Sequence, residues 1–274
     1  MSYNRVVTDE TLELFHASER GDAKAVASLV KHPNTDINWH RTQSYGATPI
    51  IAAIMNGHKD VVEILLDANA DIGALKTPDR NSPLHEAAFR DEPEIMQLIL
   101  SKIQLDNNQS ISALVDLQNQ VASHVACKLN RHVGDVCLSS LTYVVARMLQ
   151  FGNTPLHNAA RTGSAGCVAN LLKADAKVTI KNVNGSLPLH HACYCEKPNL
   201  AVVKLLVDAG SDVNDRDKQG YTPMIIAAKK NQTDVIDNLR SRGADAKLKN
   251  VFGEDALHFA TLRENTNAME LLDE

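Results

Sequence analysis

The sequence predicts an all-α solenoid built from stacked pairs of short helices. The first observation is a helix-start pattern at residues 152–163, and the second is its recurrence at spacings of 33 to 35 residues. A fixed period in this range is typical of stacked helical hairpins. The third is a composition with 44% hydrophobic but only 4% aromatic residues, which fits cores of Leu, Val, Ile and Ala.

The clearest copy of the pattern begins at Thr154. Its hydroxyl can accept a hydrogen bond from a backbone N–H at the helix start. Pro155 suits the first helical position, where its missing N–H costs nothing. Ala159 and Ala160 keep the apolar face thin, so that a second helix can pack closely. Gly163 is expected to end the helix in the left-handed conformation.

The copies share this opening and a second, more apolar helix. Similar openings occur at Thr48, Ser82, Leu187, Thr222 and Asp255, and a version without proline begins near Leu12. Second helices read Val-Val-x-x-Leu-Leu at 61–66 and Val-Val-x-Leu-Leu at 202–206, and Gly-Ala-Asp occurs at 243–245. With these motifs the chain resembles an ankyrin-repeat protein over nearly its whole length. The resemblance implies an L-shaped stack of helix pairs with β-hairpin loops projecting at the base.

We expect a single ankyrin-repeat array over residues 1–274, with about seven clear repeats. The expected boundaries are an N-terminal capping repeat at 8–43, repeats at 44–79 and 80–104, an irregular block at 105–150, repeats at 151–184, 185–218 and 219–251, and a C-terminal capping repeat at 252–274.

The irregular block has two interpretations, because Thr154 lies 72 residues after Ser82 where two periods would give about 66. In the first, a degenerate repeat starts at Val121, 33 residues before Thr154. In the second, residues 116–119 once continued straight into Phe151 and Gly152, and the residues between are an inserted helical excursion. The first interpretation is preferred, and both remain open.

Composition excludes several classes of protein. The net charge of −5 argues against generic polyanion binding. No apolar run is long enough to span a membrane, and residues 1–10 lack the apolar core of a signal peptide. Five cysteines without framework spacing indicate reduced thiols. We therefore expect an intracellular, cytoplasmic protein.

No enzyme motif is present, and no cofactor or metal is expected. The cluster at 190–195 holds metal-ligand residue types, but its spacing favours core packing. His124, Cys127, His132 and Cys137 form a second such set without finger spacing. The recurring histidines His85, His157, His190 and His258 share one structural position. An alternative of another class is a thiol- or metal-dependent enzyme in the 101–150 block, which would need Cys127 or Cys137 exposed and acidic.

The resemblance directs attention to the concave face, which ankyrin repeats form from hairpin tips and first helices. At the tips, large or polar residues precede the tip glycine, and exposed aromatic residues there favour partner contact. The candidate tip residues are Trp39, Tyr45, Phe151, Asn184, Gln219 and Phe252.

Inner positions of the first helices carry a second set, which mixes apolar and basic side chains beside the single acid Glu86. The candidates are Met55, Phe89, Arg90, Arg161, Tyr194, Lys229, Lys230 and Arg263, with Phe259 and Leu262 alongside. Such a groove favours an acidic partner segment with apolar anchors. No dense basic stripe is present, which argues against nucleic acid.

We therefore expect a non-catalytic, monomeric protein-binding module acting as an adaptor, inhibitor or targeting subunit. One alternative is a bacterial effector that is delivered into a host cell and binds host proteins. A further possibility follows from the resemblance: residues around Asn214 match the asparagine-hydroxylation pattern of ankyrin repeats, so Asn214 is a candidate modification site.

Overall fold

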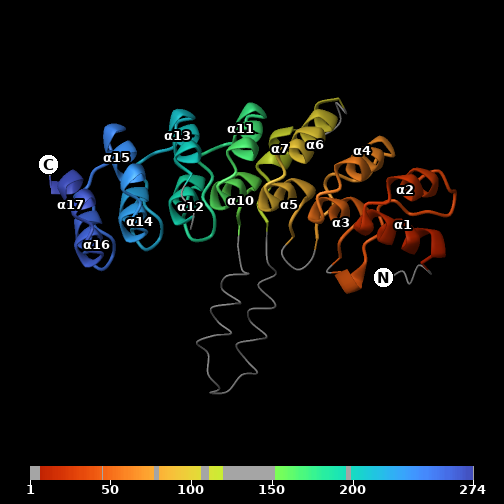
Figure 1. Cartoon of the computed structure of the whole chain (residues 1–274), viewed down its shortest axis with the longest axis horizontal. Helices are drawn as coiled ribbons and strands as arrows, with labels where there is room; N and C mark the ends of the chain where they lie inside the picture. The colour runs from red at the N-terminus through yellow and green to blue at the C-terminus, as the bar shows by residue number, and fades with distance from the viewer. Residues whose placement is uncertain are drawn as a thin grey trace, which may run out of the picture. The chain divides into compact units, whose positions relative to one another are not determined.

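The computed structural model describes residues 7–44, 46–76, 80–105, 111–119, 152–195 and 199–273. These residues fall into two compact units. The first holds the described residues up to Leu114 together with Asn119, and the second holds 115–118 and the described residues from Gly152 onward. Figure 1 shows the helix pairs of each unit in chain order. Tyr45, Phe151 and the segment 120–150 lie outside the described residues.

The first unit contains three helix pairs and two shorter elements. Its pairs are α1 (Asp9–Arg20) with α2 (Ala23–Leu29), α3 (Pro49–Met55) with α4 (Lys59–Asp67), and α5 (Pro83–Arg90) with α6 (Pro93–Leu105). A 3₁₀ turn, η1 (Thr42–Ser44), precedes α3, and α7 (Ile111–Val115) follows α6.

The second unit contains four helix pairs. They are α10 (Pro155–Thr162) with α11 (Ala165–Lys173), α12 (Pro188–Tyr194) with α13 (Leu200–Asp208), α14 (Pro223–Lys229) with α15 (Thr233–Ser241), and α16 (Ala256–Leu262) with α17 (Thr266–Asp273). The described residues thus hold seven helix pairs, in agreement with the predicted number of clear repeats.

The predicted helix starts are confirmed. Thr154 accepts a hydrogen bond from the His157 N–H at 3.4 Å, and Ser82, Thr222 and Asp255 cap their helices in the same way. Thr48 also stands at the N-cap position but makes no side-chain cap bond. Gly163 ends α10 with φ of 78°, the left-handed conformation expected of it.

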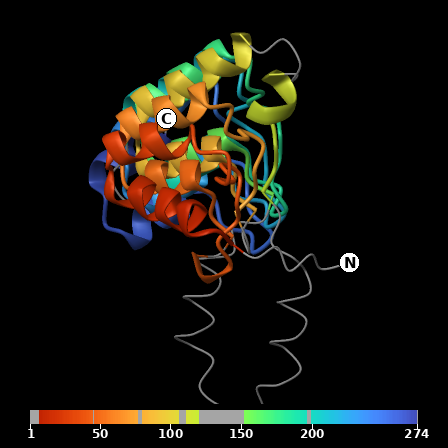
Figure 2. The ribbon, with the colours of Figure 1, turned by 90° about the vertical axis from the view of Figure 1, so that its right-hand side faces the viewer.

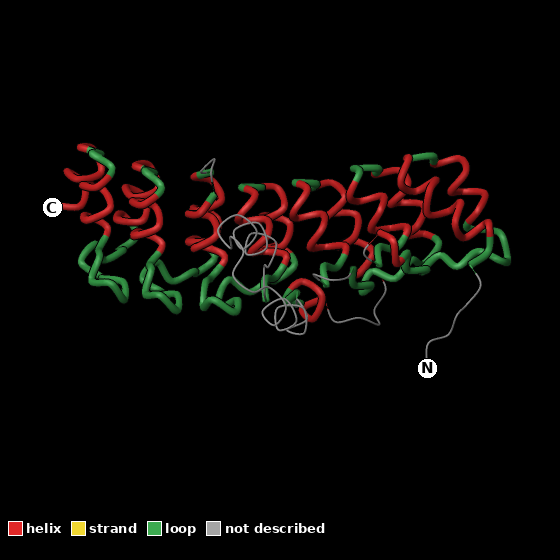
Figure 3. Tube along the Cα trace, turned by 90° about the horizontal axis from the view of Figure 1, so that it is seen from below, coloured by secondary structure: helices red, strands yellow, loops and turns green. Residues whose placement is uncertain are grey.

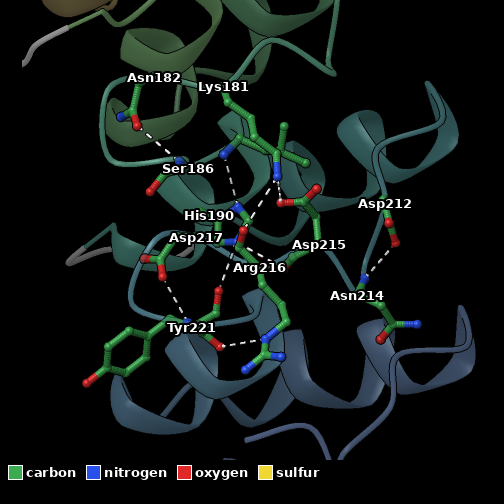
Figure 4. Close-up of polar contacts among 12 residues, drawn as sticks. Lys181, Asn182, Ser186, His190, Asp212, Asn214, Asp215, Arg216, Asp217 and Tyr221 are labelled. Atoms are coloured by element: carbon green, nitrogen blue, oxygen red, sulfur yellow. Dashed lines mark hydrogen bonds and ion pairs between the residues drawn. The ribbon is translucent and has the colours of Figure 1, made fainter. Parts of the chain in front are cut away.

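In two repeats of the second unit, a histidine ties its own helix start to the next loop. Nδ1 of His190 accepts the Leu187 N–H at 3.0 Å, which replaces the cap that leucine cannot provide. Its Nε2 then donates to the carbonyl oxygens of Asp215 and Tyr221, at 3.2 and 3.1 Å (Figure 4). His157 repeats this arrangement, with Nδ1 on the Thr154 N–H at 3.1 Å and Nε2 on the Ser186 carbonyl at 3.0 Å.

These bonds require neutral imidazoles, because Nδ1 must accept while Nε2 donates. Burial lowers the pKa of His190, which also favours the neutral ring. The nearby carboxylates of Asp215 and Asp217 oppose this shift only in part. The structural role predicted for this histidine position therefore fits the contacts of His157 and His190.

The core lies between successive helices of the same kind. First helices pack in sequence, α1 on α3 on α5 and α10 on α12 on α14 on α16, and second helices do the same. The alanine pair of the pattern stands at these contacts, and Ala159, Ala160, Ala227 and Ala228 are all buried. Because these side chains are small, consecutive helices approach closely, as the sequence predicted.

The loops between repeats are tight hairpin turns, and no strand occurs among the described residues. Two backbone bonds close each of the turns at 182–186 and 217–221. Asn182 N–H donates to the Ser186 carbonyl at 3.0 Å and Gly185 N–H to the Asn182 carbonyl at 2.9 Å, and the turn at 217–221 repeats this pattern. Isolated antiparallel bridges join Arg41 to Ala47 and Lys76 to Asn81. Within each unit the loops gather along one side of the helix pairs (Figures 2 and 3).

Over the parts of the chain that the structure describes, every helix is too short or too polar to cross a lipid bilayer.

Candidate protein-binding surface

The first helices of the second unit, together with the loop before α14, bring cations and aromatic rings together. We call Tyr194, Tyr221, Lys229, Lys230 and Phe259 the cation–aromatic patch. Tyr194 ends α12, Lys229 ends α14, and Phe259 lies in α16, while Tyr221 stands in the loop before α14. Consecutive packing of these three helices therefore assembles the patch from three repeats.

Lys229 is the centre of the patch. Its Nζ lies 4.8 Å from the ring centroid of Tyr221 and 5.4 Å from that of Phe259. It also lies 3.4 Å from the Tyr221 hydroxyl oxygen. The two rings are buried, with centroids 6.2 Å apart. An ammonium group over ring faces is attracted by their quadrupoles, which holds the charge in a defined place.

Lys230 extends the patch toward solvent. Its Nζ lies 5.7 Å from the ring centroid of Tyr194, whose side chain is 38% exposed. Partial burial raises the pKa of Tyr194, and the Asp217 carboxylate and Tyr221 add to the shift. The Tyr194 hydroxyl therefore stays protonated at neutral pH and can donate a hydrogen bond.

The cations of this region have no acidic partners. Across the described residues, no carboxylate lies within ion-pair distance of Lys229, Lys230 or Arg263. Some other cations of the unit are paired, as Lys181 is with Asp215 at 2.8 Å. The patch thus carries positive charge that the described chain does not neutralise.

Glu86, the single acid among the inner helix positions, is buried. Glu86 is 2% exposed and makes an ion pair with Lys76 at 2.7 Å. It also accepts a hydrogen bond from the Asn81 side chain at 2.9 Å. The single acid that the sequence placed among the inner positions therefore serves the interior of the first unit.

Several hairpin tips present their side chains to solvent. Phe252 is 68% exposed, and Asn184 and Gln219 are exposed as well. Backbone bonds order the tips, since Lys218 N–H donates to the Asn184 carbonyl and Val251 N–H to the Gln219 carbonyl, both at 2.9 Å. Tyr45 and Phe151, the other two predicted aromatic tips, lie outside the described residues.

The remaining candidates have diverse surroundings. Trp39 is half-buried and packs edge-on against Phe15, with ring centroids 6.1 Å apart. Phe89 is 41% exposed beneath the Arg90 guanidinium, 5.9 Å from its centroid. Met55 and Arg161 are half-buried. Arg161 acts on His191, whose pKa its charge helps to lower.

Asn214 clamps two repeats together, and the close-up shows it beside Asp212 (Figure 4). Its side-chain nitrogen donates to the Gly243 carbonyl at 3.0 Å, and its side-chain oxygen accepts the Asp245 N–H at 2.7 Å. The amide thus has a structural role in the array, and hydroxylation at this residue remains a prediction.

The thiols near the predicted metal cluster are buried. Cys193 is fully buried, which raises the pKa of its thiol to about 12, and Cys195 is buried too. Among the residues that the structure describes, no three His, Cys, Asp or Glu side chains are grouped as metal ligands. The second set, His124, Cys127, His132 and Cys137, lies outside the described residues.

Sequence reasoning missed three residues of this surface. Tyr221 supplies a ring under Lys229, and Val183 and Val251 are 46% and 63% exposed at the tips. The two valines each stand directly before a predicted tip residue, so their position in the repeat could have found them. Tyr221 carried no such signal, since the same position holds Asn, Ser or Glu in other repeats.

Stacked helix pairs with projecting hairpins define a repeat scaffold whose loops and first helices carry the variable surface. A family model described as ankyrin repeats (3 copies) matches residues 14–111, 123–217, 156–250 and 195–274. These matches cover most of the sequence, so the chain belongs to the ankyrin-repeat family. This is a protein–protein interaction fold and typically a non-catalytic binding module.

Similar proteins agree with this membership. Human inversin is 28% identical over 234 residues, covering 82% of this chain and 21% of inversin. The ankyrin repeat and KH domain-containing protein mask-1 of Caenorhabditis elegans is 30% identical over 231 residues, covering 82% of this chain and 8% of that protein. The chain thus spans about a fifth or less of the length of these relatives.

Solved structures show the same fold. The ankyrin repeat domain of human ASB11 superposes with a TM-score of 0.69 at 20% identity, covering 94% of this chain and 95% of that one. The ankyrin repeat domain of Bcl-3 gives a TM-score of 0.68 at 22% identity, covering 95% and 97%.

Proposed function

We propose that this chain is a non-catalytic adaptor, inhibitor or targeting subunit that binds an acidic protein segment with apolar anchors. The cation–aromatic patch and the hairpin tips of the second unit form the binding surface. The observation that carries the proposal is the placement of Lys229, an ammonium group held over two buried rings with no carboxylate partner among the residues that the structure describes.

The charge of the patch favours an acidic partner. A ring quadrupole attracts a cation but does not neutralise it, so Lys229 and Lys230 can still bind a carboxylate or phosphate. Their ammonium groups are already positioned by Tyr221, Phe259 and Tyr194, so less side-chain entropy is lost on binding. Complementary charge also speeds association and rejects basic partners.

The exposed apolar side chains favour a partner with hydrophobic anchors. Phe252 and Leu262 are 68% and 69% exposed, and Tyr194 is partly exposed beside Lys230. Aromatic and aliphatic anchors dominate binding energy when a partner removes them from water. A purely acidic, hydrophilic segment would leave these side chains in solvent and would bind more weakly.

We place this binding function in a reducing, intracellular compartment. Cys167, Cys193 and Cys195 are buried, and among the described residues they form no disulfide with one another, which supports that placement.

The experiment is a selection from a random peptide library on the immobilised chain, followed by fluorescence anisotropy with each selected peptide. We expect the selected peptides to be enriched in Asp and Glu together with Leu or aromatic residues. The variant Lys229→Glu/Lys230→Glu should weaken binding by roughly tenfold or more, about 1.4 kcal/mol. Binding to the unchanged chain should also weaken as salt is raised.

The matched control is Lys173→Glu/Lys204→Glu, which reverses two exposed lysines on the second helices α11 and α13. Its affinity should change less than twofold. An equal loss of affinity in both double variants would show that the net charge of the protein, and not the position of Lys229 and Lys230, determines binding. Selected peptides without acidic residues, or full binding by Lys229→Glu/Lys230→Glu, would overturn the proposal.

A further inference from the structure

Hydrogen bonds around Asp116 and Gln118 assign the residues on either side of the irregular block to the same repeat. We infer that residues 116–118 and 152–153 belong to one hairpin, and that residues 121–150 are an insertion in its sequence and not a repeat of the array. The inference goes beyond the binding function, because it fixes how many repeats build the array.

Four similarities match these residues with the uninterrupted hairpins elsewhere in the chain. The first is a clamp, in which a side chain accepts a backbone N–H of the next repeat. The Asp116 side chain accepts the Lys177 N–H at 2.9 Å. Asn214 accepts the Asp245 N–H and Asn38 accepts the Asp71 N–H, each at 2.7 Å. These two clamps span 31 and 33 residues, whereas the Asp116 clamp spans 61. In an uninterrupted array the partner of Lys177 would lie near residues 144–146.

The second match is a side chain that holds its own tip glycine and the next repeat. Gln118 donates to the Gly152 carbonyl at 2.6 Å and to the Lys181 carbonyl at 2.9 Å. Arg216 donates to the Gly220 carbonyl at 3.5 Å and also to the Lys249 carbonyl. Gln118 and Arg216 therefore occupy equivalent positions, although Gly220 follows Arg216 by four residues and Gly152 follows Gln118 by 34.

The third match is the environment of the two tip glycines. Both have positive φ, 70° at Gly152 and 78° at Gly220. A Cβ on Gly152 would lie 3.2 Å from the Val183 nitrogen, and one on Gly220 would lie 3.1 Å from the Val251 nitrogen. The same close approach to the next tip requires glycine at both places.

A fourth match lies within the first unit. The Asn119 side chain donates to the Asn81 side-chain oxygen at 2.8 Å, as Asn182 donates to Asn153 at 2.9 Å in the second unit. Asn182 stands three residues before its tip glycine, Gly185. Asn119 takes the same position before Gly152 when residues 121–150 are removed.

The excised sequence supports this assignment. Removal of residues 121–150 leaves Asn119-Gln120-Phe151-Gly152, which matches Asn250-Val251-Phe252-Gly253 at the last tip. Insertions are tolerated at such tips because they lie outside the core, and closing a longer loop adds little entropy cost. The rival assignment is a degenerate repeat, which the family-model match over 123–217 includes as repeat sequence.

Two deletions in the otherwise complete chain separate these assignments. Deletion of 121–150 restores the two-residue spacing of the tip, so the variant should fold with a Tm equal to or above that of the full chain. Deletion of 121–153 removes one full period from Val121 to Thr154 but also the tip glycine, so its Tm should fall. The opposite ranking by circular dichroism melting would overturn the insertion and establish a repeat.

A point variant tests the register without a deletion. Asp116→Ala removes the acceptor for the Lys177 N–H and should lower the Tm of the full chain. Asp116→Asn keeps that acceptor, as Asn38 and Asn214 do, and should restore most of the Tm. Unchanged stability in Asp116→Ala would contradict the assigned hairpin.

Discussion

The side-chain nitrogen of Asn182 donates a hydrogen bond to Nε2 of His191 at 3.0 Å. The orientation of the amide is fixed, because its oxygen accepts the N–H groups of Asn184 at 2.9 Å and Ser186 at 3.0 Å. Nε2 must therefore be an acceptor, which places the proton of the neutral ring on Nδ1. Nδ1 is buried and has no hydrogen-bond partner in the structure. A second proton on His191 would point its Nε2–H at the Asn182 N–H.

This arrangement predicts that acid destabilises the second unit. Burial lowers the pKa of His191 well below its ordinary value, and electrostatic repulsion from protonated His157, from Arg161 and from protonated His190 adds to the shift. In the unfolded chain the His191 imidazole binds a proton near pH 6.5, whereas in the folded chain it binds one only at lower pH. The contribution of His191 to the free energy of unfolding is therefore fully present above about pH 6.5, and it decreases as the pH falls below that value. Urea titrations at a series of pH values measure this slope.

His191→Gln is the matched variant for this prediction. Glutamine keeps an acceptor for Asn182 but does not titrate, so the loss of stability below pH 6.5 should be shallower than in the unchanged chain. His190 retains a lowered pKa, so part of the slope should remain. An identical slope in His191→Gln would exclude His191 as its source.

Much of the fold could be predicted from the sequence, because each helix start depends on nearby residues. Thr154 caps a backbone N–H three residues away, and Gly163 needs only its own left-handed φ. The pairing of Ala159 and Ala160 with a neighbouring helix follows from a repeated pattern. These features recur in phase, so one copy supports the interpretation of the next.

The candidate binding surface was less predictable, because its contacts join different repeats. The ring of Phe259 under Lys229 lies 30 residues further along the chain, and the partner of Glu86 is Lys76 in the preceding loop. The charge of Glu86 was visible, but its burial was not. Trp39, in a predicted tip, also packs edge-on against Phe15, a contact that the repeat pattern does not reveal. Such pairings depend on three-dimensional approach and not on the repeat pattern.

Asn214→Ala should reduce the free energy of unfolding by about 1 kcal/mol, because it leaves the Asp245 N–H and the Gly243 carbonyl without their partner. Urea unfolding followed by circular dichroism measures the loss. Asn267→Ala, at an exposed position of α17, is the control and should not destabilise. Equal stabilities of the two variants would contradict a clamp at Asn214.

Phe252→Ala should separate binding from stability. The side chain is 68% exposed, so its truncation should change the free energy of unfolding by less than about 0.5 kcal/mol. The affinity for a selected acidic peptide should fall by roughly tenfold, because the peptide loses its apolar contact with the Phe252 ring. Anisotropy titrations measure the affinity, with Gln219→Ala as an exposed tip control. A loss of affinity equal in both variants would argue against a specific aromatic contact.

The thiols of the described chain should be unreactive. Cys167 and Cys193 are fully buried and Cys195 nearly so, and the thiol pKa of Cys193 is about 12. In a Cys127→Ser/Cys137→Ser variant, Ellman's reagent at pH 8 should therefore react with no thiol of the native protein and with all three after addition of guanidinium. Rapid reaction in the native variant would show that this core is open or that one of these thiols is activated.

Removing one partner of the Lys76–Glu86 ion pair should destabilise the protein far more than removing both charges together. Glu86 is 2% exposed and Lys76 13%, so removing one partner leaves a charge in the interior of the first unit. Lys76→Met should destabilise by roughly 3 kcal/mol, because Glu86 keeps its Asn81 hydrogen bond but loses its counter-charge. Lys76→Met/Glu86→Gln removes both charges and should recover much of that loss. The test is a comparison of urea midpoints among the single and double variants. A double variant as unstable as Lys76→Met would mean that packing around Lys76, and not the isolated charge, sets the cost.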